Sequence, residues 1–248
     1  MKKSICKIIK KNSEGSKIEG SGFFCKFDKN NGFEKGMNML ITNNHIVGND
    51  DLKKKQSISI FLNNNSYSAQ IYLDNSSRII LTDKKLDYAI IEIIDSDLIE
   101  IKSSSNEEGK IITEKKKIKE ECNFLEIDSN IAIEKESLKS LYEKEPIYII
   151  HYSNSRELRS SFGVLNIIDR SNEKIYYYCT TEEGSSGSPI FSLESKNVIG
   201  LHRESPDKFN FNIGILLKDI IYEFSKYTNN LLKIDCENKK VENLNINN

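Results

Sequence analysis

The first half of the chain alternates short apolar runs with polar turn clusters. Between Ile5 and Ile94, the apolar runs are separated by segments rich in Asn, Asp and Gly, such as residues 28–36 and 63–65. Short runs bounded by turn residues favour β-strands over helices. The predicted strands are Ile5–Lys10, Gly22–Phe27, Met39–Thr42, Ser57–Leu62, Tyr67–Leu73, Arg78–Leu81 and Tyr88–Ile94.

A second series of apolar runs begins at Pro146. It is followed by Ile220, Ile221 and Phe224, whose i, i+1, i+4 spacing predicts a terminal amphipathic helix. Many short strands at regular spacing are typical of an all-β sandwich or barrel. The predicted strands of this half are Pro146–Tyr152, Ser160–Ile168, Ile175–Thr180, Ser188–Leu193, Val198–Arg203 and Phe209–Leu217.

The segment between the two series differs from both. It has weak apolar periodicity and carries a lysine run at 115–117 beside Glu120 and Glu121. Such a run is typical of solvated surface, and nucleic-acid binding is the minor alternative because no aromatic residues interleave with it. We therefore expect a connector with an irregular strand or two. The predicted organisation is a β-unit over 1–102, a connector over 103–145, a β-unit over 146–217, a helix over 218–235 and a disordered tail over 236–248.

The composition sets limits on partners. The chain has 248 residues, 38% of them hydrophobic, which is enough for one large domain or two small ones. Its 36 basic and 37 acidic residues give a net charge of −1, so no overall charge favours nucleic acid or an anionic membrane. No apolar run approaches the roughly 18–20 residues of a membrane span. Lys7, Lys10 and Lys11 interrupt the N-terminal apolar run, so no signal peptide is predicted.

The cysteines indicate a reducing compartment. They are odd in number and lack C-x-x-C spacing, which predicts reduced thiols and no metal site. We expect a cytoplasmic protein, with secretion by an unusual route as the alternative. The five cysteines are Cys6, Cys25, Cys122, Cys179 and Cys236.

A glycine-rich turn around Ser186 is the strongest chemical signal. Residues 180–189 read TTEEGSSGSP, with a tyrosine-rich apolar run before them and an apolar pair after them. A sharp turn between two strands can expose one hydroxyl and point successive backbone N–H groups into one concavity. Acyl transfer needs that pairing of a nucleophile with donors for the oxyanion. Taken alone, such a segment is more often a Gly/Ser hairpin without chemistry.

Two further residues complete a catalytic set. His45 lies at the end of the apolar strand that precedes it, and Asp87 opens another apolar strand, where a charge is costly without a partner. A buried Asp can hold an imidazole in one tautomer and stabilise its protonated form. The order His45, Asp87, Ser186 then supplies base, orienting carboxylate and nucleophile.

These segments resemble the trypsin/chymotrypsin-like serine protease family. The motifs are T-x-x-H ending at His45, D-x-A-I starting at Asp87, and G-x-S-G-S-P from Gly184 to Pro189. The resemblance implies two antiparallel six-stranded β-barrels with the site between them, followed by a C-terminal α-helix. It implies an oxyanion hole formed by the N–H groups of Gly184 and Ser186, and it matches Gly22 to an early turn of the family. No metal or organic cofactor is implied.

The motif style is closest to the bacterial glutamyl endopeptidases. Their Thr-x-x-Gly-x-Ser-Gly-Ser-Pro and Val-Ile-Gly-Leu-His segments match residues 181–189 and 198–202. The resemblance implies that Thr181 and His202 line the S1 pocket and bind an acidic side chain at P1. A hydroxyl and an imidazole can both donate to a carboxylate. A buried core histidine is the competing interpretation of His202. His151 has no partner motif, so we expect a structural role for it.

The chain also departs from the family pattern. Ser185 stands where the digestive enzymes have an Asp that receives a new N-terminus, so no such zymogen switch is expected. Thr180 stands near the pocket base in place of an acidic residue, so no preference for Lys or Arg at P1 is predicted. Glu182 and Glu183 would repel an acidic P1 side chain, and bulky charged residues occupy 203–206.

The sequence therefore predicts a serine endopeptidase with a preference for Glu, or Asp or Gln, at P1. The expected partner is a polypeptide substrate, and one dedicated partner protein is an alternative form of that expectation. The alternative is a non-catalytic module of the same fold that binds a peptide or protein in the cleft between the barrels.

Overall fold

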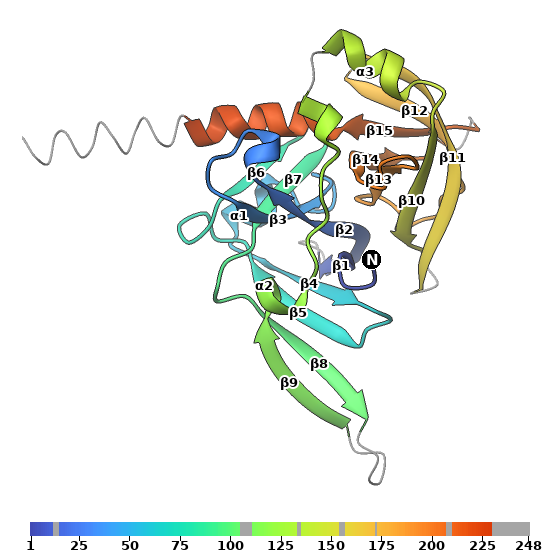
Figure 1. Cartoon of the computed structure of the whole chain (residues 1–248). Coiled ribbons are helices and arrows are strands. Elements are labelled where there is room, and N and C mark those ends of the chain that lie inside the picture. The colour runs from blue at the N-terminus through green and yellow to red at the C-terminus, as the bar shows by residue number, and fades with distance from the viewer. Residues whose placement is uncertain are drawn as a thin grey trace, which may run out of the picture.

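Two β-units lie side by side and a C-terminal helix runs across the first of them (Figure 1). The computed structural model describes residues 1–11, 15–104, 111–132, 135–153, 157–171, 173–206 and 210–229. The predicted all-β class is confirmed, because 15 strands make up the two units.

The first unit is a nine-stranded antiparallel sheet with the order β6-β7-β3-β2-β1-β4-β5-β8-β9. The inner strand β2 is buried on both faces over residues 20–25. Phe23, Cys25 and Phe27 face one apolar cluster, and Phe24 faces another. The strands are β1 Ile5–Lys11, β2 Lys17–Phe27, β3 Met37–Thr42, β4 Ser57–Leu62, β5 Tyr67–Tyr72, β6 Ile80–Asp83, β7 Tyr88–Glu92, β8 Leu98–Ser104 and β9 Ile111–Lys117.

The second unit is a closed six-stranded barrel with the order β10-β11-β12-β15-β14-β13. One apolar cluster contains Phe23 and Tyr88 from the first unit together with Phe191 and Leu201 from the second, so the two units share a core. The strands are β10 Pro146–Tyr152, β11 Leu158–Asp169, β12 Lys174–Tyr178, β13 Pro189–Ser192, β14 Val198–Glu204 and β15 Asn212–Leu216.

The first unit differs from the closed six-stranded barrel that we expected. Its sheet has nine strands, and β6 is an outer strand that does not pair with β8. Side chains bridge this gap instead. Arg78, just before β6, donates from Nη1 and Nη2 to the carboxylate of Asp97, just before β8, over 2.8 and 2.7 Å. Both side chains are almost fully buried, so the pair closes this side of the unit without backbone hydrogen bonds.

The connector contains more regular structure than predicted. Its first part is a projecting hairpin of β8 and β9 (Figure 1), followed by α2 Ile118–Glu121 and, after a short 3₁₀ turn at Ser129–Ala132, by α3 Lys135–Tyr142. Every residue of β9 is exposed, so the strand has no buried face and no apolar alternation to reveal it. The other short helices are α1 Asn49–Lys53 and the 3₁₀ turn Lys29–Asn31.

The C-terminal helix confirms the amphipathic prediction over residues 217–229. Ile220 and Phe224 are fully buried. The Phe224 ring packs against Phe27 and Phe33 of the first unit, with ring centroids 5.3 and 5.6 Å away. The rest of the predicted helix and the predicted tail at 236–248 lie outside the described residues.

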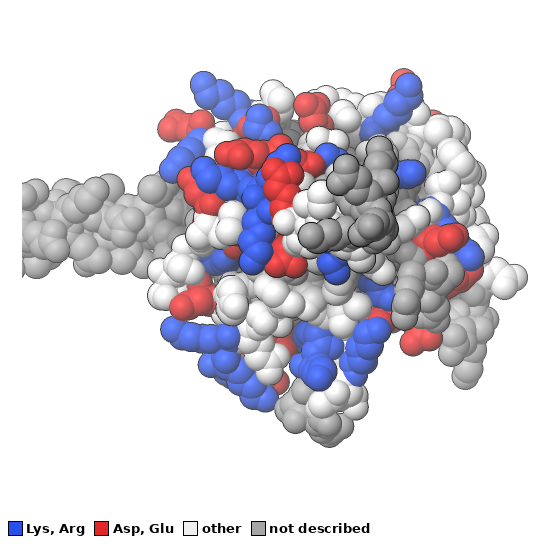
Figure 2. Space-filling model, turned by 90° about the horizontal axis from the view of Figure 1, so that it is seen from below, with Lys and Arg blue, Asp and Glu red and all other residues white. Residues whose placement is uncertain are grey.

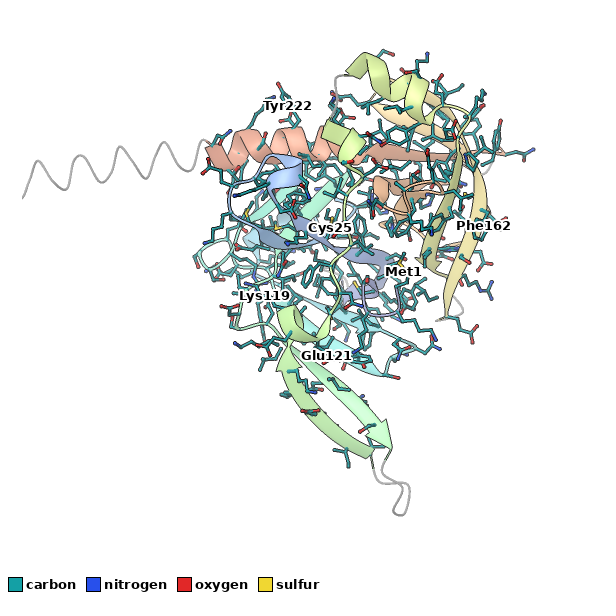
Figure 3. The ribbon with its side chains drawn as sticks, viewed as in Figure 1. Met1, Cys25, Lys119, Glu121, Phe162 and Tyr222 are labelled. Atoms are coloured by element: carbon teal, nitrogen blue, oxygen red, sulfur yellow. The ribbon has the colours of Figure 1, made fainter. Side chains whose placement is uncertain are left out.

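The surface carries mixed charge. On the face seen from below, basic and acidic side chains are interspersed (Figure 2). Phe162 projects from the outer face of β11 and is 66% exposed, whereas Cys25 lies in the interior (Figure 3). Within the described ranges, no helix is long and apolar enough to cross a membrane.

Candidate active site

The turn that carries Ser186 connects β12 to β13. Gly184 and Gly187 both have left-handed φ angles, +91° and +89°, which glycine adopts without steric cost. Two successive backbone hydrogen bonds close the turn: the Ser185 N–H donates to Glu182 O, and the Ser188 N–H donates to Ser185 O. Ser186 is left half-buried at the tip.

Ser21 joins this turn to the first unit. Its N–H donates to Ser186 O over 2.7 Å, and its hydroxyl donates to Gly184 O over 2.8 Å. The same hydroxyl accepts the N–H of Tyr152 in β10 over 3.1 Å. Thr42 in turn donates to Ser21 O over 2.8 Å. A fully buried serine of β2 therefore places the nucleophile turn against the first sheet.

His45 and Asp87 form the predicted pair. The His45 ring donates from Nδ1 to Asp87 Oδ2 over 2.8 Å, and its backbone N–H donates to Oδ1 over 3.0 Å. Asp87 is buried and has a left-handed φ of 60°, a conformation that Asp tolerates better than most residues. Asn43 holds this backbone by donating from Nδ2 to Asp87 O over 2.9 Å. The carboxylate thus fixes both the tautomer and the orientation of His45.

The Ser186 hydroxyl does not bond to His45 in this structure. It donates to the backbone carbonyl of Arg203 over 3.2 Å. Register shifts between His202 and Glu204 where β14 pairs with β15, so Arg203 lies at a bulge. Bulges redirect side chains, and here Arg203 Nε lies 3.5 Å from Asp87 Oδ2, the oxygen that also accepts from His45.

A polar cluster surrounds the predicted S1 residue Thr181. Its Oγ1 lies 2.7 Å from Asn212 Oδ1 and 2.6 Å from Ser205 Oγ, and Ser205 Oγ lies 2.6 Å from Asn212 Oδ1. Asn212 Nδ2 donates to Cys179 O over 2.7 Å, which fixes the amide with its oxygen toward the two hydroxyls. The Thr181 and Ser205 hydroxyls therefore have only two hydrogens to donate among these three oxygen–oxygen contacts.

His202, the other predicted S1 residue, is buried and contacts the hydroxyl of Tyr177 through Nδ1 at 2.5 Å. Burial lowers the pKa of His202 to about 3 and raises the pKa of Tyr177 well above its ordinary value. Tyr177 therefore donates to a neutral imidazole, whose own proton lies on Nε2. His202 can offer a neutral N–H donor to a ligand, and it carries no positive charge.

His151 also lies at the turn. Its Nδ1 is 2.7 Å from the Ser185 hydroxyl, and both residues are buried. After burial, electrostatic interactions with His151 and His45 also lower the pKa of His202.

The comparison with protein families decides the identity. The model of the trypsin-like peptidase domain matches residues 20–201, which hold His45, Asp87 and Ser186. The chain belongs to the trypsin-like peptidase family. The matched range extends from β2 to β14 and so includes strands of both units.

The fold of this trypsin-like peptidase resembles a solved structure. The serine endoprotease from Yersinia pestis matches with a TM-score of 0.57 and 13% identity, covering 91% of this chain and 62% of that one. The likeness supports the chymotrypsin-like fold, and the chain spans 62% of the length of that structure's chain. No curated protein matches the sequence.

Some site residues of this peptidase were missed or misplaced by sequence analysis. Gly22 lies inside β2 and not at a turn, and a Cβ there would come within 2.6 Å of the Ile8 side chain. Ser21, Asn43, Arg203 and Asn212 carry no motif of their own. Their positions depend on strand pairing between distant segments, and the only available signal was that each is a polar residue next to an apolar run.

The described part of the peptidase contains no cluster of three or more His, Cys, Asp or Glu side chains suited to a metal ion. Its cysteines are free thiols: Cys6, Cys25 and Cys122 are buried, and Cys179 is half-buried. Burial raises the pKa of the Cys179 thiol to about 12, so this thiol is not an activated nucleophile.

Proposed function

We propose that the protein is a serine endopeptidase that hydrolyses peptide bonds through Ser186, His45 and Asp87. The observation that carries the proposal is that the buried Asp87 carboxylate accepts two hydrogen bonds from His45, at 2.8 and 3.0 Å. Arg203 connects this pair to Ser186, because its carbonyl accepts from Ser186 Oγ and its Nε lies 3.5 Å from Asp87 Oδ2. A carboxylate in this position stabilises the imidazolium that forms when His45 takes a proton.

In the proposed reaction, Ser186 Oγ attacks the scissile carbonyl carbon while its proton passes to His45 Nε2. The tetrahedral intermediate collapses as His45 returns the proton to the leaving amine, which gives an acyl-enzyme. Water then repeats the sequence with His45 as base and releases the acid. Atoms and protons balance without a cofactor.

The N–H groups of Gly184 and Ser186 are the proposed oxyanion donors. Within the described residues, neither N–H group makes a backbone hydrogen bond. Donors that are already oriented stabilise negative charge in a transition state without reorganisation.

Attack requires the Ser186 hydroxyl to leave the Arg203 carbonyl. That carbonyl lies near the end of β14, where an extended substrate can pair with the strand. A substrate N–H that donates to Arg203 O would compete with Ser186, and rotation of the serine side chain would turn its hydroxyl toward His45. Substrate binding would thereby complete the base–nucleophile contact.

A fluorophosphonate probe tests the activation of Ser186. We expect a covalent adduct on the tryptic peptide that contains Ser186, formed at a rate that falls when the protein is unfolded first. The Ser161 and Ser192 hydroxyls provide internal controls in the same barrel and should remain unmodified. Absence of an adduct from the folded protein contradicts the proposal.

The contact between Ser186 and Arg203 O also favours a second candidate. With the hydroxyl held away from His45, the protein would be a module that binds a peptide or partner between its two units. Peptide binding without turnover or labelling would support this candidate. Turnover by the purified protein removes it.

We further propose that the S1 site prefers Glu, Asp or Gln at P1. The hydroxyls of Thr181 and Ser205 can turn toward a carboxylate, and Asn212 Oδ1 can accept from a Gln amide. His202 adds a neutral donor, so the site selects by hydrogen bonding and not by net positive charge. A pocket that leaves its polar groups unpaired discriminates against apolar side chains.

Peptides that differ only at P1 test this preference. We expect higher kcat/KM for Glu and Gln than for Leu and Lys. Thr181→Val removes one hydroxyl at nearly constant volume and should lower the Glu-to-Leu ratio about tenfold, the equivalent of one hydrogen bond.

Thr82→Val is the matched control, because the Thr82 hydroxyl also donates to an Asn oxygen, that of Asn49, but outside the S1 cluster. Its Glu-to-Leu ratio should equal that of the unchanged protein. A P1 profile dominated by Lys, Arg or Leu would disprove the preference.

A further inference from the structure

His151 is a buried histidine that the proposed chemistry does not use. It lies in β10, next to Tyr152, and is 3% exposed. Its Nδ1 lies 2.7 Å from the hydroxyl of Ser185, which is 1% exposed. Buried polar groups in proteins are nearly always hydrogen-bonded, and this hydrogen bond ends on the residue next to the nucleophile.

Ser185 holds the turn through both its backbone and its side chain. Its hydroxyl oxygen accepts the Glu182 N–H over 3.0 Å, and its own N–H donates to Glu182 O over 3.0 Å. Its carbonyl accepts the Ser188 N–H over 3.1 Å. Ser185 also stands between Gly184 and Ser186, so any rotation of its backbone would redirect both proposed oxyanion donors.

The contacts of Ser185 leave its hydroxyl hydrogen available to His151. The bond from the Glu182 N–H uses only an acceptor site of the oxygen, so the hydroxyl can donate to Nδ1 of a neutral His151 that carries its proton on Nε2. Protonation of His151 would place an N–H on Nδ1 facing the serine and would remove the acceptor.

The surroundings of His151 keep it neutral. Desolvation by burial lowers its pKa; the Glu182 carboxylate in the turn acts in the opposite direction, and the Arg159 guanidinium on β11 adds to the lowering. Arg159 and Glu182 pair with one another over 2.8 Å, which offsets their separate effects. His202 on β14 interacts electrostatically with His151, and burial lowers the pKa of His202 to about 3, so it adds no positive charge there above that pH.

We propose that His151 is a positioning residue: through its hydrogen bond to Ser185 it holds the Gly184 and Ser186 N–H groups in the geometry that stabilises the oxyanion. This proposal rests on the proposed function. It also assigns a role to the side chain of Ser185, which is buried although the residue is next to the nucleophile. His151 contacts the turn from the second unit, whereas Ser21 contacts it from the first.

Three variants test the role on kcat and KM with a cleaved peptide. His151→Leu and Ser185→Ala each remove the bond, and we expect each to lower kcat about 10- to 100-fold, a part of the loss caused by removing an oxyanion donor. KM should stay within about threefold, because the effect is on the transition state. His151→Asn keeps an acceptor near the Nδ1 position and should restore most of kcat. Combining His151→Leu with Ser185→Ala should cost little more than either change alone.

The pH profile separates positioning from mere folding. With His151 present, the protonation of its imidazole at low pH should add to the fall in kcat, and the slope of log kcat against pH should steepen from 1 toward 2. His151→Asn should keep a slope of 1. Both profiles are measured above the pH at which circular dichroism shows unfolding.

Ser192→Ala is the matched control. Ser192 is a buried serine of the same barrel whose hydroxyl also accepts a backbone N–H of its own turn, that of Ser195 over 3.3 Å. It should leave kcat unchanged even if it lowers the melting temperature. If His151→Leu fails to fold, Ser185→Ala and His151→Asn still report on the bond.

Fluorophosphonate labelling distinguishes the two proposals. Both proposals are supported if the unchanged protein is labelled and His151→Leu and Ser185→Ala are labelled more slowly. Labelling of all these proteins at one rate leaves the serine peptidase standing and overturns the role of His151. No labelling of the unchanged protein overturns both.

Discussion

Replacing Ser186 with alanine is expected to remove peptide hydrolysis almost completely. The hydroxyl oxygen forms the proposed covalent bond to the substrate, and loss of the nucleophile from such a triad costs roughly 10⁶-fold in kcat. Binding of substrate should survive, because Arg203 O, the Thr181 cluster and the proposed oxyanion donors are unchanged. The measurement is kcat for a cleaved peptide, together with its Kd for the variant.

Ser188→Ala is the control for this change. Ser188 lies two residues further along the same turn and is fully buried, and its hydroxyl has no hydrogen-bond partner among the described residues. Removing an unpaired buried hydroxyl should leave kcat unchanged and stability equal or higher. Equal hydrolysis by Ser186→Ala and the unchanged protein would show that another residue performs the chemistry.

The strands were predicted best where polar turns bound a run that is buried in the fold. The predicted bounds Ser57–Leu62 and Pro146–Tyr152 are those of β4 and β10. After an exposed first residue, β4 alternates buried and half-buried residues and β10 is buried almost throughout, so the apolar pattern and the structure report the same feature.

The connector could not be predicted in the same way. In β9, Ile111 and Ile112 are exposed and are followed by charged residues, so the strand is held by backbone pairing to β8 and not by burial. In α3, Leu138 and Tyr142 are buried, but the exposed Leu141 between them blurs the helical spacing of the apolar residues. This hairpin adds the last two of the nine strands to the sheet of the first unit, and the apolar pattern does not reveal it.

The candidate site was predicted unevenly for a related reason. His45, Asp87 and Ser186 each sit in a short motif, and the structure brings His45 and Asp87 together as expected. The Arg203 contact could not be foreseen, because it depends on a bulge that shifts the pairing of β14 by one residue. The bond between His151 and Ser185 likewise joins two segments that are adjacent only in the folded barrel.

The nucleophile turn is thus held from two sides. Ser21 fixes its carbonyls from the first unit, and His151 fixes Ser185 from the second. A turn with two left-handed glycines has few bonds of its own, so its conformation depends on these neighbours. The position where the first unit comes closest should therefore be the least tolerant of added atoms.

Gly187→Ala should disrupt both stability and activity at this position. An added Cβ would lie 2.0 Å from Ser21 O and 2.6 Å from Thr42 Oγ1, and Gly187 has a φ of +89°. The left-handed conformation costs a residue with a Cβ about 1–2 kcal/mol, and overpacking against backbone adds about 1–3 kcal/mol. The relief of this clash must move the turn away from β2, and Ser186 with it. We expect a loss of about 3 kcal/mol in the free energy of unfolding, measured by urea denaturation, and at least a 100-fold loss in kcat/KM.

Gly15→Ala separates the two causes of this loss. Gly15 has a similar φ of +82°, but a Cβ there would meet nothing within 4 Å. It should therefore incur only the conformational cost of about 1–2 kcal/mol and leave kcat/KM unchanged. The difference between the two variants measures the close approach of Ser21 to the nucleophile turn. If Gly187→Ala keeps full activity while folded, the contact of Ser21 with Ser186 O is not needed to place the nucleophile, and the turn would be held by the second unit alone.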